Sequence, residues 1–327
     1  MDIINVKHLC KTYKVNKRDS GFKNALKAFF KRDYRYIKAV DDISFNIREG
    51  EIVGYIGPNG AGKSTTIKML AGILKPDSGE MLVNGMNPTT DRIKYVKEIG
   101  VVFGQKSQLW WDIPAIESFD LLRDIYRVPS DEYVKTRDEL IELLNLSEIV
   151  RTPVRSLSLG ERMKCELVAS LLHNPKILFL DEPTIGLDAI SKVIVRDFIK
   201  KINKEKKVTV ILTTHDMADI ESLAKRVIVI GNGKKLYDGN MDDIKKKYSN
   251  EKIVEIYYEK LKEVPKIKDA EIISNENGVV KIKIDSHKVT ASDVTMAYSK
   301  VCEIKDINVL SSPIDDIIYK LYEDFQI

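Results

Sequence analysis

Long apolar runs are missing from this 327-residue sequence. No window approaches the run of about eighteen uncharged apolar residues that a membrane-spanning helix requires. The N-terminus, MDIINVKHLC, also lacks the long apolar core of a signal peptide. We therefore expect that the chain itself does not span a membrane.

Cysteine is scarce as well. The three cysteines, Cys10, Cys165 and Cys302, are odd in number, widely spaced and without metal-ligand spacing. This argues against a disulfide framework and against a cysteine-based metal site. A reduced, cytosolic compartment is the natural expectation.

An excess of one charge is also absent. The 53 Lys and Arg against 49 Asp and Glu leave a net charge of +4, far from the imbalance of a dedicated nucleic-acid binder. We expect no direct nucleic-acid partner, and any basic surface must be local. The chain is longer than one typical domain, and its 43% of hydrophobic residues suffice for a sizeable core, so two domains are expected.

The sequence does contain a glycine-rich loop, GPNGAGKST, between a short apolar strand and an amphipathic helix. Gly57, Gly60 and Gly62 allow main-chain N–H groups to approach an anion closely. Lys63 follows at the start of the helix, where unpaired N–H groups and the helix dipole favour negative charge, and Ser64 has a hydroxyl suited to Mg²⁺. The pattern predicts a phosphate-binding loop. The alternative is a plain glycine turn.

Two further apolar segments carry polar side chains at their C-terminal ends. KILFLDEP contains Asp181 and Glu182, and VTVILTT is followed by His215. Parallel sheets place ligand sites at this edge. Because adjacent side chains of an extended segment point apart, we expect Asp181 to face Mg²⁺ and Glu182 to face an attacking water. The alternatives are an acidic capping pair and a structural histidine.

Helical spacing replaces the strand pattern between residues 107 and 172, which predicts a helical subdomain there. Gln105 directly follows a predicted strand, and its side-chain carbonyl could reach a metal, although a lone glutamine is normally a loop residue. Ser158, within LSLGE, is a plausible helix cap. Such a cap would offer a second helix N-terminus to an anion.

The stretch 14–38 is a basic insert with nine Lys or Arg against two Asp and with apolar residues at helical spacing. This predicts a short amphipathic helix that lies on a membrane surface, on a partner or on its own domain. An edge strand is expected before it, over residues 2–14. Tyr13 in that strand could stack on an adenine ring or be an ordinary surface tyrosine.

The last eighty or so residues follow a different pattern, with strands, an NENG turn, a helix and a final amphipathic helix. They predict a small C-terminal α+β accessory domain without a catalytic constellation. We place the two domains at residues 1–248 and 249–327.

In order along the chain, GPNGAGKST, Gln105, LSLGE, ILFLDEP, Gly186-Leu187-Asp188 and His215 resemble the motif set of ABC-type ATPases. The resemblance covers roughly residues 1–245. It implies an α/β P-loop NTPase core with an antiparallel β subdomain and a helical subdomain. It also implies an ATPase that uses Mg²⁺ and a second ATPase subunit, most simply a homodimer, in which the phosphate loop of one subunit faces the signature segment of the other.

The resemblance also assigns roles. Lys63 would hold phosphates, Glu182 would polarise water and His215 would sense the γ-phosphate, and these three form the catalytic group. Mg²⁺ would bind Ser64, Gln105 and Asp181. The ATP-contacting residues would be Tyr13, Gly57, Asn59, Gly60, Ala61, Gly62, Lys63, Ser64, Thr65, Gln105, Ser158, Gly160 and Asp188.

Within that set, the resemblance assigns three residues to the contact between the two subunits and one to the adenine base. Ser158 and Gly160 would close on the partner's ATP, and Asp188 would link the two sites. Tyr13 would be the adenine-stacking aromatic, with Tyr34 and Tyr36 as rivals because the basic insert separates Tyr13 from the rest of the core.

The signature departs from the family's usual LSGGQ at two positions. Leu159 adds bulk where the family commonly has glycine. Glu161 adds negative charge near a helix start that faces phosphate, which would weaken anion binding unless the side chain points away.

The phrases GQKSQLWW and LSLGERM, with the basic insert, most resemble stand-alone ATPase subunits of bacterial ABC exporters, including daunorubicin-type and sodium-efflux-type relatives. Such a subunit works at the cytoplasmic face of the cell membrane with separate membrane-spanning permease subunits. Trp110 and Trp111 lie where the family docks the permease, or else in the core of the helical subdomain. The alternatives are an importer ATPase with a substrate-sensing C-terminal domain and a soluble ABC protein acting on nucleic acid or ribosomes.

Overall fold

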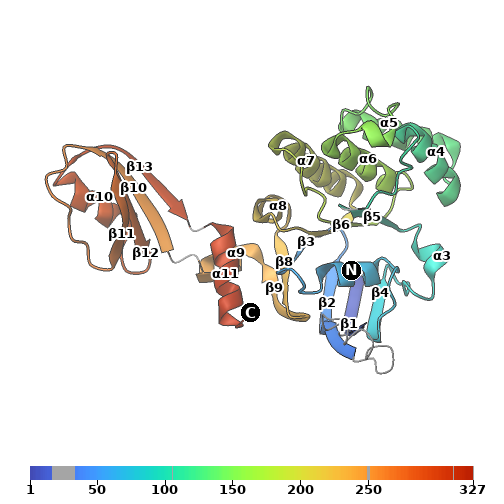
Figure 1. Cartoon of the computed structure of the whole chain (residues 1–327), viewed down its shortest axis with the longest axis horizontal. Coiled ribbons are helices and arrows are strands. Elements are labelled where there is room, and N and C mark those ends of the chain that lie inside the picture. Colours follow the sequence, from blue (N-terminus) through green and yellow to red (C-terminus); the bar gives the residue numbers. More distant parts are fainter. Residues whose placement is uncertain (17–33, 105, 249–250, 312, 327) are drawn as a thin grey trace, which may run out of the picture. The chain divides into compact units, whose positions relative to one another are not determined.

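The computed structural model describes residues 1–16, 34–104, 106–248, 251–311 and 313–326 (Figure 1). It forms two compact units, Met1–Gly239 and Asn240–Ile327. The sequence-based boundary after residue 248 differs from this division, because helix α9 (Met241–Tyr248) packs against α11 (Ile314–Asp324) of the second unit. Among the described residues, no helix combines the length and the apolar character needed to cross a membrane.

A six-stranded sheet forms the centre of the first unit. Its order is β5-β6-β7-β3-β8-β9, and the neighbours from β5 to β8 run parallel. The central strands are short apolar runs buried on both faces, as expected for a parallel sheet covered by helices. The strands are β3 (Ile52–Ile56), β5 (Ile99–Phe103), β6 (Ile177–Asp181), β7 (Thr209–Thr213), β8 (Arg226–Gly231) and β9 (Lys234–Asn240).

A three-stranded antiparallel sheet has the order β2-β1-β4. Its strands are β1 (Asp2–Asn16), β2 (Tyr34–Arg48) and β4 (Ser78–Val83). The prediction of an edge strand at the N-terminus was wrong, since β1 pairs with β2 on one side and β4 on the other. Apolar side chains of this sheet, such as Ile4 and Ile43, share one core with Tyr55 of β3 and Ile67 of the helix after it.

The basic insert is shorter than its predicted range of 14–38, because both ends of that range are strand. Residues 14–16 continue β1 and residues 34–38 belong to β2, and the two strands pair there from Lys14↔Tyr36 to Asn16↔Tyr34. Residues 17–33, which contain the apolar positions of the predicted helix, lie outside the described residues.

The predicted helical subdomain contains α4 (Ala115–Tyr126), α5 (Ser130–Leu143), a short 3₁₀ turn (Val154–Ser156) and α6 (Leu159–Leu171). Within the first unit these three α-helices gather on the side opposite the antiparallel sheet (Figure 1). The other helices among the described residues of this unit are α2 (Lys63–Leu70), α3 (Arg92–Tyr95), α7 (Ala189–Lys206) and α8 (Met217–Leu223).

The second unit is an antiparallel sheet of order β11-β12-β10-β13 with helix α10 on one face. The elements follow the sequence prediction: β10 (Glu251–Glu259), β11 (Ala270–Glu276), β12 (Val279–Asp285), α10 (Ala291–Ser299) and β13 (Glu303–Ser311). Val254, Ile256 and Ile282 of the sheet form a core with Val294 and Tyr298 of α10.

Two tyrosines of the second unit allow a test of this core, because we expect their substitutions to change the free energy of unfolding in opposite directions. Tyr298 is buried, and its hydroxyl has no partner within the described chain. The Tyr258 hydroxyl instead donates to Asn275 Oδ1 at 2.6 Å. We expect Tyr298→Phe to raise the free energy of unfolding by about 1 kcal/mol and Tyr258→Phe to lower it by about 1 kcal/mol, because only the first removes an unsatisfied polar group. Urea denaturation of the full chain would measure both, and a less stable Tyr298→Phe variant would contradict the packing described.

Candidate active site

The phosphate loop joins β3 to α2, and Lys63 folds back over it. Its Nζ donates to the carbonyl oxygens of Gly57 at 2.7 Å and Pro58 at 3.2 Å. Burial lowers the pKa of Lys63, while the nearby Glu182 and Asp181 carboxylates oppose that shift. In the part of the chain that the structure describes, Lys63 forms no ion pair. A buried cation held only by neutral oxygens fits an anionic ligand.

The start of α2 is built for close backbone approach. Gly62 precedes the helix with φ +104°, and a Cβ there would lie 2.1 Å from the carbonyl oxygen of Ala39. No side chain caps the first N–H groups of α2. Those groups therefore stay available to a phosphate, as the sequence pattern predicts. Asn59 and Gly60 form the exposed tip of the loop, while Ala61 is buried beneath it.

Asp181, at the end of β6, connects three elements. Ser64 Oγ of α2 donates to Asp181 Oδ1 at 3.2 Å, and Thr213 of β7 donates to the same oxygen. The backbone N–H of Gly104 donates to the Asp181 carbonyl at 2.8 Å. Sequence reasoning missed Thr213, although it ends an apolar strand and pairs in register with Asp181.

The hydroxyl of Ser64 and the carboxylate of Asp181 form a pair of hard oxygen donors that fits Mg²⁺. No group of three His, Cys, Asp or Glu that could hold a metal exists among the described residues. A metal here would therefore need further oxygen ligands from a bound phosphate and water. Gln105, the third predicted metal ligand, lies outside the described residues.

Glu182 and His215 meet at the ends of β6 and β7. Glu182 Oε1 lies 2.8 Å from His215 Nε2. The Glu182 backbone has φ +57°, a conformation that costs a non-glycine residue about 1–3 kcal/mol, and its N–H donates to the Thr213 carbonyl at 2.9 Å. A cavity of about 240 Å³ is lined by Ser64, Lys68, Ile73, Phe103, Gly104, Lys106, Asp181 and Glu182. Asp181, Glu182, Ser64 and Gly104 therefore line one cavity.

The signature segment caps α6. Ser158 Oγ accepts from the Glu161 N–H at 3.3 Å, and Glu161 Oε2 accepts from the Ser158 N–H and Oγ, both at 2.8 Å. These hydrogen bonds lower the pKa of the Glu161 carboxyl. The acid therefore turns back onto the cap instead of pointing away, and its negative charge stays at the helix start.

Gly160 and Asp188 lie close together within one chain. Asp188 caps α7 by accepting from the Ser191 N–H at 2.9 Å and the Ser191 Oγ at 2.7 Å. A Cβ on Gly160 would lie 2.7 Å from Ser191 Oγ and 3.8 Å from Asp188 Oδ2. No hydrogen bond of the described residues connects Ser158 with the phosphate loop.

Comparison with known proteins decides the family. The ABC transporter family model matches residues 40–185. The chain is 31% identical to the uncharacterized ABC transporter ATP-binding protein YhcH of Bacillus subtilis, over 85% of this chain and 88% of YhcH. This chain belongs to the ABC transporter ATP-binding proteins.

Other relatives have names that state a role. The chain is 32% identical to the linearmycin resistance ATP-binding protein LnrL of Bacillus subtilis, over 69% of this chain and 72% of LnrL. It is 37% identical to the methionine import ATP-binding protein MetN of Geobacillus kaustophilus, over 63% of this chain and 61% of MetN. The ABC family therefore includes relatives named for resistance and for import.

The fold matches solved ABC cassettes. The dimeric ATP-binding cassette MJ0796, solved in a post-hydrolysis state with ADP and Pi, has a TM-score of 0.61 at 27% identity, over 73% of this chain and 98% of that chain. The predicted P-loop ABC core is confirmed. The protein is the ATP-binding subunit of an ABC transporter and an ATPase.

In this ABC subunit, Tyr13 is the tyrosine on the side of the phosphate loop. Its hydroxyl lies 3.5 Å from Thr65 Oγ1 and its side chain is 37% exposed. Tyr13 pairs with Ile37, whereas Tyr36 pairs with Lys14. Because side chains alternate along a strand, Tyr36 and Tyr34 face away from Tyr13.

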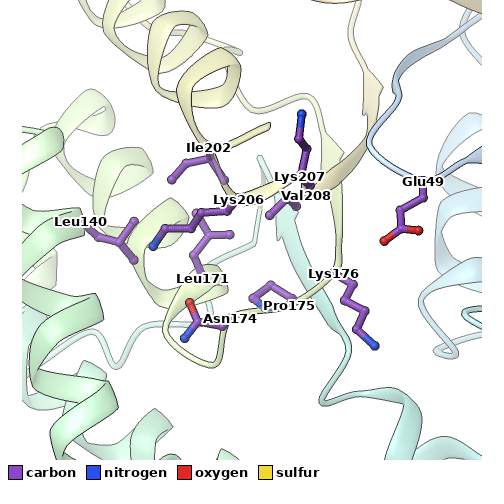
Figure 2. Close-up of a pocket in the computed structure, with 10 residues that line it drawn as sticks. All are labelled: Glu49, Leu140, Leu171, Asn174, Pro175, Lys176, Ile202, Lys206, Lys207 and Val208. Carbon is purple, nitrogen blue, oxygen red and sulfur yellow. The ribbon is translucent and has the colours of Figure 1, made fainter. Parts of the chain in front are cut away.

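A second cavity of the ABC core, of about 170 Å³, lies at the opposite end of the strands of the parallel sheet (Figure 2). Lys176 directly precedes β6 and Val208 directly precedes β7, so these lining residues mark the N-terminal ends of the strands. Asp181 lies at the C-terminal end of β6. The cavity is therefore separate from the phosphate site and contains none of the predicted site residues.

The Ser64–Asp181 pair makes a metal-dependent prediction. We expect Asp181→Asn to raise the Kd for MgATP at least about tenfold and to change the Kd for ATP in EDTA less than about threefold, because the lost charge acts through the metal. Isothermal titration calorimetry with and without Mg²⁺ measures both values, with exposed Asp112→Asn as the matched control. Equal losses in both buffers would contradict a metal role for Asp181.

Proposed function

We propose that this ABC ATPase drives export as a peripheral subunit at the cytoplasmic face of the cell membrane. It works as a homodimer that binds two ATP and couples to separate membrane-spanning permease subunits. The observation that carries the proposal is that Lys63, Asp181 and Glu182 lie together at the C-terminal ends of the central strands, while no hydrogen bond among the described residues joins the capped helix start at Ser158 to them. A second chain would supply the missing half.

The proposed hydrolysis follows from the positions of the side chains. The loop amides and Lys63 bind the β- and γ-phosphates. The Glu182 carboxylate accepts a proton from water as the water oxygen bonds to the γ-phosphorus and the bond to the β-phosphate oxygen breaks, so that ADP leaves. His215, in contact with Glu182, orients that carboxylate and donates a hydrogen bond to the γ-phosphate.

Mg²⁺ would be held by Ser64, Asp181 and Gln105, and when bound it would neutralise charge on the phosphates. Thr213 keeps the Asp181 carboxylate turned toward Ser64 by donating to the oxygen that Ser64 also contacts. The role of Thr213 is therefore to position the carboxylate that reaches the metal.

Substitution of Glu182 gives the most direct test of this mechanism. We expect Glu182→Gln to bind ATP and to accumulate as a closed dimer, with turnover lowered about 10²- to 10⁴-fold, because water activation is lost while the phosphate contacts remain. Size-exclusion chromatography with ATP and a phosphate-release assay would report both effects. The control is Glu205→Gln on α7, which is exposed. Turnover by Glu182→Gln at the wild-type rate would contradict the role of Glu182.

A second prediction concerns Glu161, the acid of the signature segment. Glu161→Gln keeps the capping geometry but removes the negative charge that would meet the partner's γ-phosphate. We expect ATP-dependent dimerisation in the Glu182→Gln background to tighten at least about threefold. Analytical ultracentrifugation at fixed MgATP measures the dimer Kd. Weaker dimerisation, with an unchanged melting temperature, would show that Glu161 itself serves the interface.

Tyr13 makes a third prediction, which concerns the base. We expect Tyr13→Ala to raise the Kd for ATP about 5- to 150-fold, the loss of one stacked ring, and to leave the Kd for inorganic triphosphate unchanged. Tyr36→Ala, on the other face of the β1–β2 ribbon, is the matched control. Equal effects of the two variants on ATP would remove Tyr13 from the site.

Two observations support export and permease docking. The linearmycin resistance protein LnrL is similar over more than two thirds of both chains. Trp110 and Trp111 are 41% and 50% exposed, so the alternative that they form the core of the helical subdomain does not hold. Arg162 of α6 lies over the Trp111 ring at 5.7 Å. We assign this exposed aromatic pair to contact with the permease.

The importer alternative rests on the similarity to MetN and on the second unit. The alignment of MetN with this chain is 209 residues long, which is shorter than the 239 residues of the first unit. The alignment of YhcH is 281 residues long and must therefore extend into the second unit. Co-expression with candidate permeases, followed by transport into or out of cells, separates the two directions. Substrate-dependent uptake that requires Glu182 would overturn export.

A further inference from the structure

Hydrogen bonds anchor the described residues on both sides of Gln105. On its N-terminal side the Gly104 N–H donates to the Asp181 carbonyl at 2.8 Å, which fixes Gly104 to the central sheet. On its C-terminal side Ser107 Oγ donates to Glu166 Oε1 of α6, in the helical subdomain. Gly104 is therefore bonded to the central sheet, and Ser107 to the helical subdomain.

Glu166 is an unusual anchor. Its side chain is 3% exposed, and the described residues include no Lys, Arg or His paired with it. The Gln108 N–H donates to both carboxylate oxygens at 3.2 Å, and Gln108 Nε2 donates to the Glu166 carbonyl at 3.1 Å. Burial raises the pKa of Glu166, and the hydrogen bonds from Ser107 and Gln108 oppose that shift. A buried acid without a cation is costly, so its place is explained by the backbone segment that it holds.

The fixed segment continues to the exposed tryptophans. Ser107 Oγ also accepts from the Leu109 N–H at 3.1 Å. The Trp110 N–H donates to the buried Ser118 Oγ of α4 at 3.1 Å, and the Arg155 N–H donates to the Trp111 carbonyl at 3.0 Å. From Ser107 to Trp111 the chain is therefore bonded to the helical subdomain rather than to the sheet.

We propose that Glu166 is a positioning residue that makes residues 107–111 and α6 move as one body. The geometry gives it two roles at once. Glu166 transmits a movement of the chain at Gly104, on the nucleotide side, to the tryptophan pair. It also transmits this movement along α6 to the signature cap at Ser158. The inference rests on the proposed function, because it presumes that nucleotide binding at the phosphate loop displaces this segment.

The chain contains its own reporter for this link, since Trp110 and Trp111 are the two tryptophans of the sequence. In the Glu182→Gln background, we expect MgATP to change the tryptophan emission. We expect Glu166→Ala to reduce that change at least about fivefold, while the Kd for ATP, measured by calorimetry, stays within about threefold. Loss of the optical response without loss of binding is an effect that general destabilisation does not produce.

The matched control is Ser170→Ala. Ser170 is buried on the same helix, and its hydroxyl donates to the Leu167 carbonyl without touching the segment. We expect the full emission change in this variant. A full change in Glu166→Ala, or no change on ATP binding in the parent protein, overturns the proposal.

Two further variants keep the test decisive if Glu166→Ala does not fold. Glu166→Gln retains the size of the side chain but turns an amide toward the Gln108 N–H, so we expect a partial loss of the emission change. Ser107→Ala removes the hydroxyl that bonds to Glu166 and leaves α6 unaltered, and a full response in it would also overturn the link. Failure of ATP to bind at all would instead count against the assigned phosphate site, which calorimetry reports separately.

Discussion

The site depends on one residue, Asp181, and on the register of the strands around it. Its carboxylate receives hydrogen bonds from Ser64 and Thr213, and its carbonyl receives one from Gly104. These contacts join α2, β7 and the end of β5 to β6. Because the strands are parallel, Phe103, Asp181 and Thr213 lie level at the same sheet edge. A slip of one strand would separate the hydroxyl from the carboxylate and leave no place for a metal bound to phosphate.

The C-terminal ends of the central strands carry a buried cation and a strained acid. Lys63 is buried against neutral carbonyl oxygens, and Glu182 holds a left-handed backbone conformation in contact with His215. Both features cost free energy in the folded chain, and in the proposed function the phosphates of ATP repay it. The cavity at the N-terminal ends of the strands is lined by none of these side chains.

Local patterns predicted the parts of the site that lie in one stretch of sequence. The loop glycines, the acids that end β6 and the cap at Ser158 follow from turn, strand and helix chemistry, and the structure contains each of these elements. Thr213 and Glu166 were not predicted, because their roles depend on strand register and on a contact between residues far apart in sequence. For the same reason the N-terminal strand was misplaced at an edge: its second partner, β4, comes more than sixty residues later.

In the proposed function, a working site needs two chains. Mixing two inactive variants tests it most directly: Lys63→Ala removes the phosphate-holding cation, and Ser158→Phe blocks the exposed cap of α6. Each variant alone should lack ATPase activity. We expect the mixture to regain activity, because in a mixed dimer the intact phosphate loop of one chain meets the intact signature segment of the other. A mixture as inactive as its components, despite dimers that form with ATP, would contradict a site shared between two copies.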